Sequence, residues 1–307
     1  MRRLIRIGTR ESQLAIWQAT EVKEQLAKQG FSAELVPIKS EGDIDLCTPL
    51  YQMGVQGVFT RSLDAAILNN KIDIAVHSMK DVPIQLARGI VQSAVLKRAS
   101  HKDILVHTRN TAFLDDFRSV AHIATSSVRR RAQWLNRYPD HIIENIRGNV
   151  NTRLQKLKDS HWQGAIFAAA GLERIQLRPE NSIDLNWMLP APAQGAILVV
   201  CRENDFYCRE ASATIHHQST ALCTSIERDF LKKLMGGCST PISALAEIKN
   251  NTVHFEGNIL SLDGKEKVSV NLSTTIQLSE SFGIKAAEEL LNSGGDKIAE
   301  TIRNAAK

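Results

Sequence analysis

Several features that are common in other protein classes are missing from this chain of 307 residues. No apolar run is long enough to cross a bilayer, and the basic start from Met1 to Arg6 is not followed by the apolar core of a signal peptide. Aromatic residues make up only 5% of the sequence and no basic tail is present, which argues against a stacking platform for single-stranded nucleic acid. We therefore expect a cytoplasmic protein that binds neither membrane nor nucleic acid.

The cysteine and histidine patterns also exclude several classes of site. The five cysteines are Cys47, Cys201, Cys208, Cys223 and Cys238. They form no CxxC pair, which argues against zinc and thioredoxin-type chemistry, and their odd number in a cytosolic chain predicts free thiols. No metal-ligand spacing accompanies His77 or the pair His216 and His217, so we interpret these as structural histidines and predict no metal.

What the chain does contain is typical of a globular protein with an acidic ligand. Hydrophobic residues make up 43% and charged residues 23% of the sequence, and the length predicts two or three domains. The net charge of +5 favours anionic partners.

Two similar α/β halves are predicted, because short apolar segments alternate with helical patterns. The segment from Ile7 to Ser12 resembles that from Ile123 to Val128, which indicates a duplicated unit with a cleft between the copies. Predicted strands cover 4–7, 33–38, 72–76, 121–124, 142–146, 165–169 and 170–172, and predicted helices cover 12–29, 59–67, 126–136 and 150–157. Residues 42–57 have little periodicity, and we predict a mobile lid there.

The composition changes after about residue 217. A helical stripe from Leu222 to Leu234 ends at Gly236 and Gly237, and alternating segments with turn signals follow. A last amphipathic helix, 284–291, is predicted to end at Gly294 and Gly295. This part is predicted to be an α+β domain.

Hydroxyl and guanidinium groups recur where a strand turns into a helix. Thr9, Arg10 and Ser12 form one such set, and a second set contains Thr125, Ser126, Ser127, Arg129 and Arg130. Helix N-termini attract carboxylates and phosphates, so both sets are candidate anion sites. The alternative is simple helix capping by Ser and Thr with solvated arginines.

Further arginines stand at predicted strand ends. Arg147 and Arg153 bracket a Gly-Asn turn before a helix, and Arg174 follows the predicted strand at 170–172. Because a guanidinium fits a carboxylate in two places, a ligand with several carboxylates would explain the set.

Asp81 and Cys238 are the candidate reactive residues. Asp81 follows a buried strand and precedes Pro83, where it could stabilise a cation or move protons, although an ordinary surface pair with Lys80 remains open. Cys238 lies on a Gly-Gly loop after a helix C-terminus, which disfavours a thiolate, so we expect a thiol that reacts once with a strong electrophile.

These residues belong to motifs that, in order and spacing, resemble the porphobilinogen deaminase family over nearly the whole chain. The motifs are Thr9-Arg10-x-Ser12, 75–83 (AVHSMKDVP), Thr125-Ser126-Ser127-x-Arg129-Arg130, Arg147-Gly148-Asn149-Val150-x-Thr152-Arg153, Ala170-Gly171-Leu172, Gln194-Gly195-Ala196 and Gly236-Gly237-Cys238-x-x-Pro241.

The resemblance implies two periplasmic-binding-protein-like α/β lobes and a smaller α+β C-terminal domain. Lobe 1 would comprise 1–99 and 196–214, with the lid at 42–58, because the family's chain crosses back after the second lobe. Lobe 2 would comprise 100–195 and the C-terminal domain 217–307. A monomer is expected.

The resemblance also implies an activity and a covalent cofactor. Four porphobilinogen molecules would be added to a dipyrromethane held through a thioether on Cys238, each with loss of ammonia, before hydrolysis releases hydroxymethylbilane. Asp81 matches the catalytic aspartate, which would stabilise the cationic azafulvene left when ammonia departs. Residues implied to hold the cofactor are Ser78, Lys80, Thr125, Ser127, Arg129, Arg130, Arg147, Arg153 and Gln194, and those implied to hold substrate are Arg10, Ser12, Phe59, Arg147, Arg153 and Arg174.

Some positions depart from the family pattern. Gln52 and Gln56 stand where the lid usually carries lysines, and Asn151 replaces a usual glycine.

Two other interpretations remain at this point. One is a two-lobed anion-binding protein without catalysis, which would need neither Asp81 nor Cys238. The other is a nucleic-acid binder, which the dispersal of the arginines over many strand ends disfavours.

Overall fold

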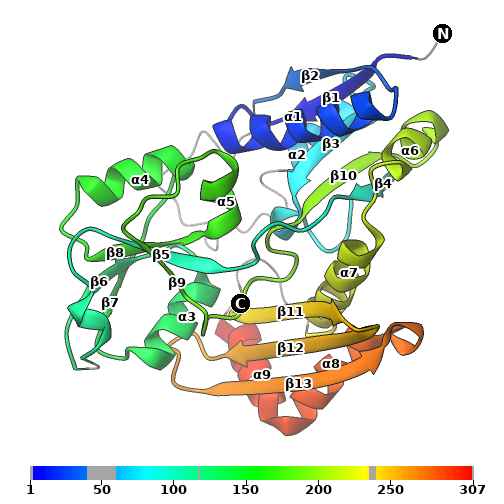
Figure 1. The fold of residues 1–307 in the computed structure, drawn as a ribbon. Helices are drawn as coiled ribbons and strands as arrows, with labels where there is room; N and C mark the ends of the chain where they lie inside the picture. Colours follow the sequence, from blue (N-terminus) through cyan, green and yellow to red (C-terminus); the bar gives the residue numbers. More distant parts are fainter. Residues whose placement is uncertain (1–2, 40–59, 117, 235–239, 306–307) are drawn as a thin grey trace.

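The computed structural model describes residues 3–39, 60–116, 118–234 and 240–305. Three separate β-sheets organise these residues, two of five strands and one of three (Figure 1). Each of the two larger sheets carries helices and forms an α/β lobe. The third sheet packs with helices of its own and forms the C-terminal domain, as the change of pattern near residue 217 predicts.

Lobe 1 contains the sheet with strand order β2-β1-β3-β10-β4. Strands β1, β2 and β3 are parallel, whereas β10 runs antiparallel to both neighbours, β3 and β4. The elements are β1 (Ile5–Thr9), α1 (Gln13–Lys28), β2 (Ala33–Pro37), α2 (Arg61–Leu68), β3 (Ile74–Ser78), β4 (Ile90–Val95), β10 (Ile197–Arg202) and α6 (Phe206–Ala213). Because β10 joins this sheet, the chain does cross back after lobe 2, as expected.

Lobe 2 repeats this plan with the strand order β7-β6-β8-β5-β9. Here β6, β7 and β8 are parallel and β5 is antiparallel to β8 and β9, so every strand has a counterpart in lobe 1. The elements are β5 (Asp103–His107), β6 (His122–Ala124), α3 (Val128–Arg137), β7 (Ile142–Glu144), α4 (Val150–Lys158), β8 (Gly164–Ala168), α5 (Ala169–Arg174) and β9 (Ser182–Asp184). The duplication predicted from the sequence is confirmed.

One predicted element of lobe 2 is wrong. Residues 170–172 were expected to form a strand, but they lie within α5, which begins directly after β8. The segment is rich in alanine and lacks β-branched residues, and alanine is the strongest helix former. Leu172 is buried against the core of β8 and Ile104, so the helix is held by packing despite its short length.

The C-terminal domain packs helices against one face of an antiparallel sheet, β11-β12-β13. Its core contains Phe230, Phe255 and Phe282, with Phe230 and Phe255 ring centroids 5.0 Å apart. The elements are α7 (Gln218–Lys233), β11 (Ile242–Lys249), β12 (Thr252–Leu260), β13 (Lys267–Thr275), α8 (Phe282–Leu290) and α9 (Asp296–Ala305). The predicted stop at Gly294, which has φ +100°, is a kink, and the unpredicted α9 follows it.

The chain passes between the two lobes twice, once near Ala99 and once near Gly195, and these two connecting segments lie against each other. The N–H of Ala99 donates to the carbonyl of Gly195 at 3.1 Å, and Gly195 adopts φ +86°. A Cβ atom on Gly195 would lie 2.6 Å from the carbonyl oxygen of Ser100, so no other residue fits without moving the backbone. The backbone near Gly195 therefore lies very close to the backbone of Ala99 and Ser100.

The C-terminal domain binds both of these connecting segments through one buried carboxylate. Glu227 of α7 is fully buried and pairs with Arg98 at 2.6 Å. Its two oxygens also accept the backbone N–H groups of Ala193, at 2.6 Å, and Ala246, at 2.8 Å. Burial alone would lower the pKa of Arg98, but attraction and hydrogen bonding to Glu227 outweigh it and raise that pKa. The two segments that connect the lobes are therefore bound to α7 and, through the same carboxylate, to β11.

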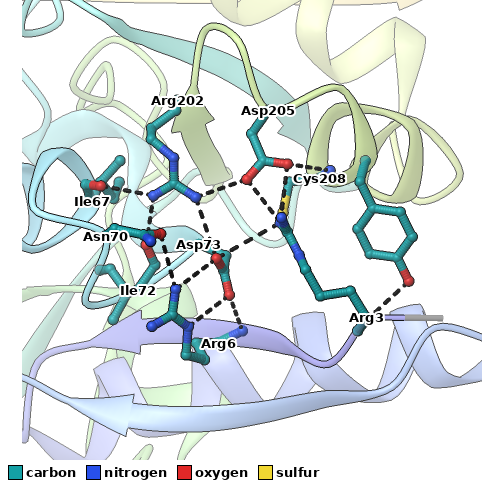
Figure 2. Close-up of polar contacts among 10 residues, drawn as sticks. Arg3, Arg6, Ile67, Asn70, Ile72, Asp73, Arg202, Asp205 and Cys208 are labelled. Carbon is teal, nitrogen blue, oxygen red and sulfur yellow. Dashed lines mark hydrogen bonds and ion pairs between the residues drawn. The ribbon is translucent and has the colours of Figure 1, made fainter. Parts of the chain in front are cut away.

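A second polar cluster fastens the outer end of lobe 1 (Figure 2). Asp73 binds Arg6 at 2.9 Å and Arg202 at 3.3 Å, while Asp205 binds Arg3 and Arg202, each at 2.8 Å. The cluster joins β1 to the segment before β3 and to the end of β10. It lies away from the carboxyl ends of the parallel strands, and its arginines are already paired with protein carboxylates, so we interpret it as structural.

Candidate active site

A cavity of about 240 Å³ lies between the lobes, where the parallel strands of both sheets end. Ligands of open α/β sheets bind at this edge. The charged residues lining the cavity are Arg10, Lys80, Asp81, Arg130, Arg147, Arg153 and Arg174. Among the lining residues that the structure describes, six are cationic and only Asp81 is acidic. Such a surface suits a ligand with several negative charges.

Lobe 1 supplies the carboxylate from a short turn. β3 ends at Ser78 and continues into a 3₁₀ turn, Met79–Asp81, which presents Lys80 and Asp81 to the cavity. The Lys80 Nζ lies 3.1 Å from Oε1 of Gln194. Burial lowers the pKa of Lys80 to about 8, against the opposing attraction of Asp81. Asp81 is exposed and lines the cavity.

The start of α1 gives lobe 1 its second contribution. Arg10 and Ser12 follow β1 and line the cavity. The Ser12 hydroxyl caps α1 by accepting the N–H of Ala15 at 3.3 Å. Ser78 is linked to Gln18 of α1, whose Nε2 donates to the Ser78 hydroxyl at 2.9 Å. Ser12 thus has the capping role that the sequence left open, and it faces the cavity as well.

Lobe 2 supplies arginines from a Gly-Asn turn before α4. Gly148 adopts φ +113°, and the Asn149 side chain caps α4 by accepting the N–H of Thr152 at 3.0 Å. The turn places Arg147 and Arg153 on the cavity wall, with Arg147 only 5% exposed. The Nε of Arg153 donates to the carbonyl of Gly148 at 2.8 Å. Burial and the nearby Arg130 lower the pKa of Arg153 to about 10, so it remains charged at neutral pH.

Arg174 closes the other side of the cavity. Its Nη2 donates to the carbonyl of Gly195 at 2.7 Å, and its guanidinium lies 5.7 Å from the ring centroid of Trp17. Burial lowers its pKa to about 10. Although the predicted strand before it is a helix, Arg174 still reaches the site, because α5 begins at the carboxyl end of β8.

A buried aspartate organises the remaining arginines, and the sequence interpretation missed it. Asp103 is fully buried and binds Arg129 at 2.6 Å, Arg130 at 2.7 Å and the Nε2 of Gln194 at 2.9 Å. Burial alone would raise the pKa of Asp103, but these arginines and Lys80 hold it well below its usual range. The signal was present: Asp103 directly precedes the apolar run 104–106, and a buried carboxylate needs cationic partners.

Four of the predicted site residues stand behind the cavity wall. Arg129 and Gln194 contact Asp103, and neither lines the cavity. Ser127 caps α3 by accepting the N–H of Arg130 at 3.4 Å, and the Thr125 hydroxyl accepts the N–H of Ser127 at 3.2 Å. Their direct contact with a ligand therefore stays a prediction, whereas their support of Arg130 is visible in the structure.

Two predicted features lie outside the described residues. Cys238 and Phe59 fall in 235–239 and 40–59, as do Cys47 and the lid at 42–58. The described cysteines Cys201, Cys208 and Cys223 are buried and free. Burial raises the pKa of Cys208 to about 12 and that of Cys223 to about 11, which fits the expectation that they are inert.

The predicted structural histidines have local partners or deep burial. Nδ1 of His216 accepts the N–H of Val95 at 3.1 Å, and His217 caps α7 by accepting the N–H of Thr220. Burial, with a contribution from Arg10, lowers the pKa of His77 to about 4.

No helix in the described part of the chain is long and apolar enough to cross a membrane.

Comparison with known proteins places this site in a family. Two sequence-family models match this chain. The one described as porphobilinogen deaminase, dipyrromethane cofactor binding domain, matches residues 5–210. The one described as porphobilinogen deaminase, C-terminal domain, matches residues 221–292. The porphobilinogen deaminase of Syntrophotalea carbinolica is 39% identical over 97% of this chain and 96% of its own length. That of Desulforamulus reducens is 39% identical over 99% of both chains.

Among solved structures, the methionine-binding protein MetQ aligns with 73% of this chain and 94% of its own, with a TM-score of 0.44 and 12% identity. The matches to the two family models are consecutive and cover the lobes and the C-terminal domain in turn. The chain belongs to the porphobilinogen deaminase family.

Proposed function

We propose that this chain joins porphobilinogen molecules into a linear tetrapyrrole, with release of ammonia at each addition. The observation that carries the proposal is the cavity in which six cationic side chains surround the single carboxylate of Asp81 among the described lining residues. Each pyrrole of the substrate carries an acetate and a propionate, so the growing product accumulates negative charge. The cations match that charge, and the carboxylate matches the cation formed when ammonia leaves.

The same cavity fits a dipyrromethane cofactor. A dipyrromethane of this kind carries four carboxylates, and the donor set around the cavity consists of guanidinium, ammonium, hydroxyl and amide groups. Arg130, Arg147 and Arg153 of lobe 2, with Ser12 and Lys80 of lobe 1, would hold it. Bound there, it supplies the pyrrole carbon to which the first substrate is joined. We propose that it is attached to Cys238, which the sequence motif assigns and which lies outside the described residues.

In this proposal Asp81 is the catalytic residue. Departure of ammonia from the protonated aminomethyl group of porphobilinogen leaves the positive charge on the pyrrole, and the Asp81 carboxylate would stabilise it without reorganising. After the new carbon–carbon bond forms, the same carboxylate would accept the proton released from the pyrrole carbon.

The arginines would act by binding and orientation. Arg147 and Arg153 stand on a rigid capped turn, and Arg130 is held by Asp103. Charge-assisted hydrogen bonds to guanidinium groups are stronger than neutral ones and fix geometry in two places. We propose that Arg10 and Arg174, at the other side of the cavity, hold the incoming substrate.

A two-lobed anion-binding protein without catalysis is the competing function. It would use the arginines but would need neither a carboxylate at the cavity wall nor a covalent group. Asp81 stands in a wall whose other charged residues, among those the structure describes, are all cationic. This favours the enzyme, because a binding protein for anions would gain affinity by losing this charge.

The decisive experiment is an intact mass of the purified full chain. We expect a mass that exceeds the sequence by one dipyrromethane, and we expect Cys238→Ala to remove both the extra mass and the activity. Cys223→Ala is the matched control and should keep both. A wild-type chain with no added mass that still forms hydroxymethylbilane would disprove the covalent attachment, and one that forms none would favour the binding protein.

A further inference from the structure

Lobe 2 carries a second cluster of ligand-type side chains, away from the cavity. His122, Glu144 and His161 each offer a nitrogen or oxygen atom, and these atoms all lie within 4.8 Å of one another. Nδ1 of His122 lies 2.9 Å from Oε1 of Glu144, and the rings of His122 and His161 meet edge to face with centroids 4.9 Å apart. None of the three lines the cavity.

The sheet register explains why the first two side chains meet. β6 and β7 are parallel, with His122 opposite Ile142 and Ala124 opposite Glu144. His122 and Glu144 are therefore diagonal neighbours on the same face of the sheet, within reach of long side chains. Ala124 packs in the core on the α4 side, so this is the face that α4 covers. The pair lies at the edge of that face, because β7 is an edge strand.

His161 is brought to the pair by the turn between α4 and β8. The Gln163 N–H donates to the carbonyl of His122 at 3.0 Å, and the N–H of His122 donates to Oε1 of Gln163 at 2.6 Å. The Thr108 hydroxyl donates to the carbonyl of Trp162 at 2.8 Å, and Trp162 packs against the core. β6 and the segment after β5, which lie on the two sides of β8, thus fix the turn before β8, and His161 does not need to be ordered by a ligand.

We propose that His122, Glu144 and His161 form a binding site for a divalent cation of the Zn²⁺ class, with water completing the coordination. Two imidazoles and one carboxylate are a known ligand set for zinc, which takes three protein ligands and a water in an open tetrahedral site. Zn–N bonds of about 2.0–2.1 Å place neighbouring ligand atoms roughly 3.3 Å apart in such a geometry. The 2.9 Å between His122 and Glu144 would widen slightly toward this spacing, and the other separations, which lie within 4.8 Å, would close toward it when the ion binds.

The position of the site determines what the ion would do. β6 and β7 lie on the left of Figure 1, whereas lobe 1 lies at its upper right. The ion would join the β6–β7 edge to the turn after α4 and would stabilise lobe 2 without contacting the substrate. The site therefore predicts metal-dependent stability of an enzyme whose turnover does not need the metal.

Cobalt is the suitable probe, because Co²⁺ takes the same ligands and absorbs visible light when its coordination number is low. Full-length holoenzyme without a histidine tag would be titrated with CoCl₂ after treatment with chelator. We expect absorption that saturates at one equivalent, disappears when ZnCl₂ is added, and is accompanied by a higher melting temperature with Zn²⁺. Turnover should be the same with and without Zn²⁺.

Two substitutions and one control make the assignment specific. Glu144→Gln keeps the shape of the side chain but is a poor ligand, and His161→Gln removes an exposed imidazole, so neither should disturb folding. Each should weaken cobalt binding at least about tenfold, as loss of supporting metal contacts already does. His254→Gln removes an exposed histidine in β12 that bonds Ser273 and should change nothing.

Three results would overturn the proposal. The first is absence of saturable binding in the wild-type chain at cobalt concentrations where a three-ligand site would be filled. The second is binding that survives both Glu144→Gln and His161→Gln unchanged. The third is a sulfur-to-cobalt charge-transfer band in the near ultraviolet, which would assign the ion to a cysteine.

Discussion

The two lobes share one arrangement of strands but use their carboxylates differently. In lobe 1 the segment after β3 carries Asp81, which faces the cavity. In lobe 2 the equivalent segment after β8 begins with small residues, Ala169 and Ala170, and the carboxylate is Asp103 at the start of β5. Asp103 is fully buried beneath Arg129 and Arg130.

The difference shows how one fold can supply two functions. A carboxylate exposed to the cavity can respond to charge that develops on a substrate, whereas a buried carboxylate can only neutralise its own partners. Lobe 2 therefore uses Asp103 to hold arginines in place, and we propose that lobe 1 offers Asp81 for chemistry. Removal of each carboxylate should have a distinct consequence, one on stability and one on turnover.

The largest effect is expected for Asp103→Asn. The substitution leaves the buried Arg129 and Arg130, with the half-buried Lys80 nearby, without their counter-charge. The free energy of unfolding should therefore fall by about 3–5 kcal/mol. Denaturant unfolding would measure it. Asp184→Asn in the adjacent strand is the control, since Asp184 pairs with the partly exposed Lys102 and Arg178 and should contribute about 0–1 kcal/mol. Equal losses in both variants would contradict the role given to Asp103.

The next effect is expected for Asp81→Asn, which keeps the shape but removes the charge. Turnover should fall at least about a hundredfold, because a charge-stabilising and proton-accepting group is lost. Stability should hardly change, since Asp81 is exposed to the cavity. Steady-state kinetics beside the unfolding curve would separate the two carboxylates. Turnover within a few-fold of the wild-type value would show that another group carries the chemistry.

A smaller effect is expected for the arginines of lobe 2 that face the cavity. Charge-assisted hydrogen bonds contribute roughly 1.5–3 kcal/mol each, so Arg147→Leu or Arg153→Leu should slow one or more additions by about one to two orders of magnitude. Mass spectra should then show intermediates with a defined number of pyrroles. Arg131→Leu, at an exposed position of α3 next to Arg130, is the control. Normal progress through all additions would remove these arginines from the site.

The smallest effect is expected from pH, and it concerns Lys80, the lysine among the described residues that line the cavity. Burial lowers the pKa of Lys80 to about 8, so this cation is protonated below that pH and loses its charge above it. Arg153, with a pKa of about 10, stays charged through this range. The KM for porphobilinogen should therefore rise a few-fold as the pH passes 8. In Lys80→Arg this rise should move to higher pH, and an unchanged profile would assign it to the substrate or to another residue.

Much of lobe 1 could be predicted from the sequence because its elements have strong local signals. The stripe of apolar residues in α1, its Ser12 cap and the closing Gly30 define a helix without tertiary information. β10 and β5 were not predicted, although both are apolar, because a short buried run has no period that distinguishes strand from helix. The same ambiguity explains the incorrect strand at 170–172.

The sequence by itself determined the family, the duplicated α/β units and the set of arginines, because each is expressed in local motifs or in their order along the chain. Tertiary structure decided which of those arginines line the cavity. Arg130 and Arg147 reach the cavity, whereas Arg129 turns to Asp103, 26 residues away in the chain. It also brought His122, Glu144 and His161 together from two strands and a turn. Such contacts depend on strand register and burial, which no spacing along the chain encodes.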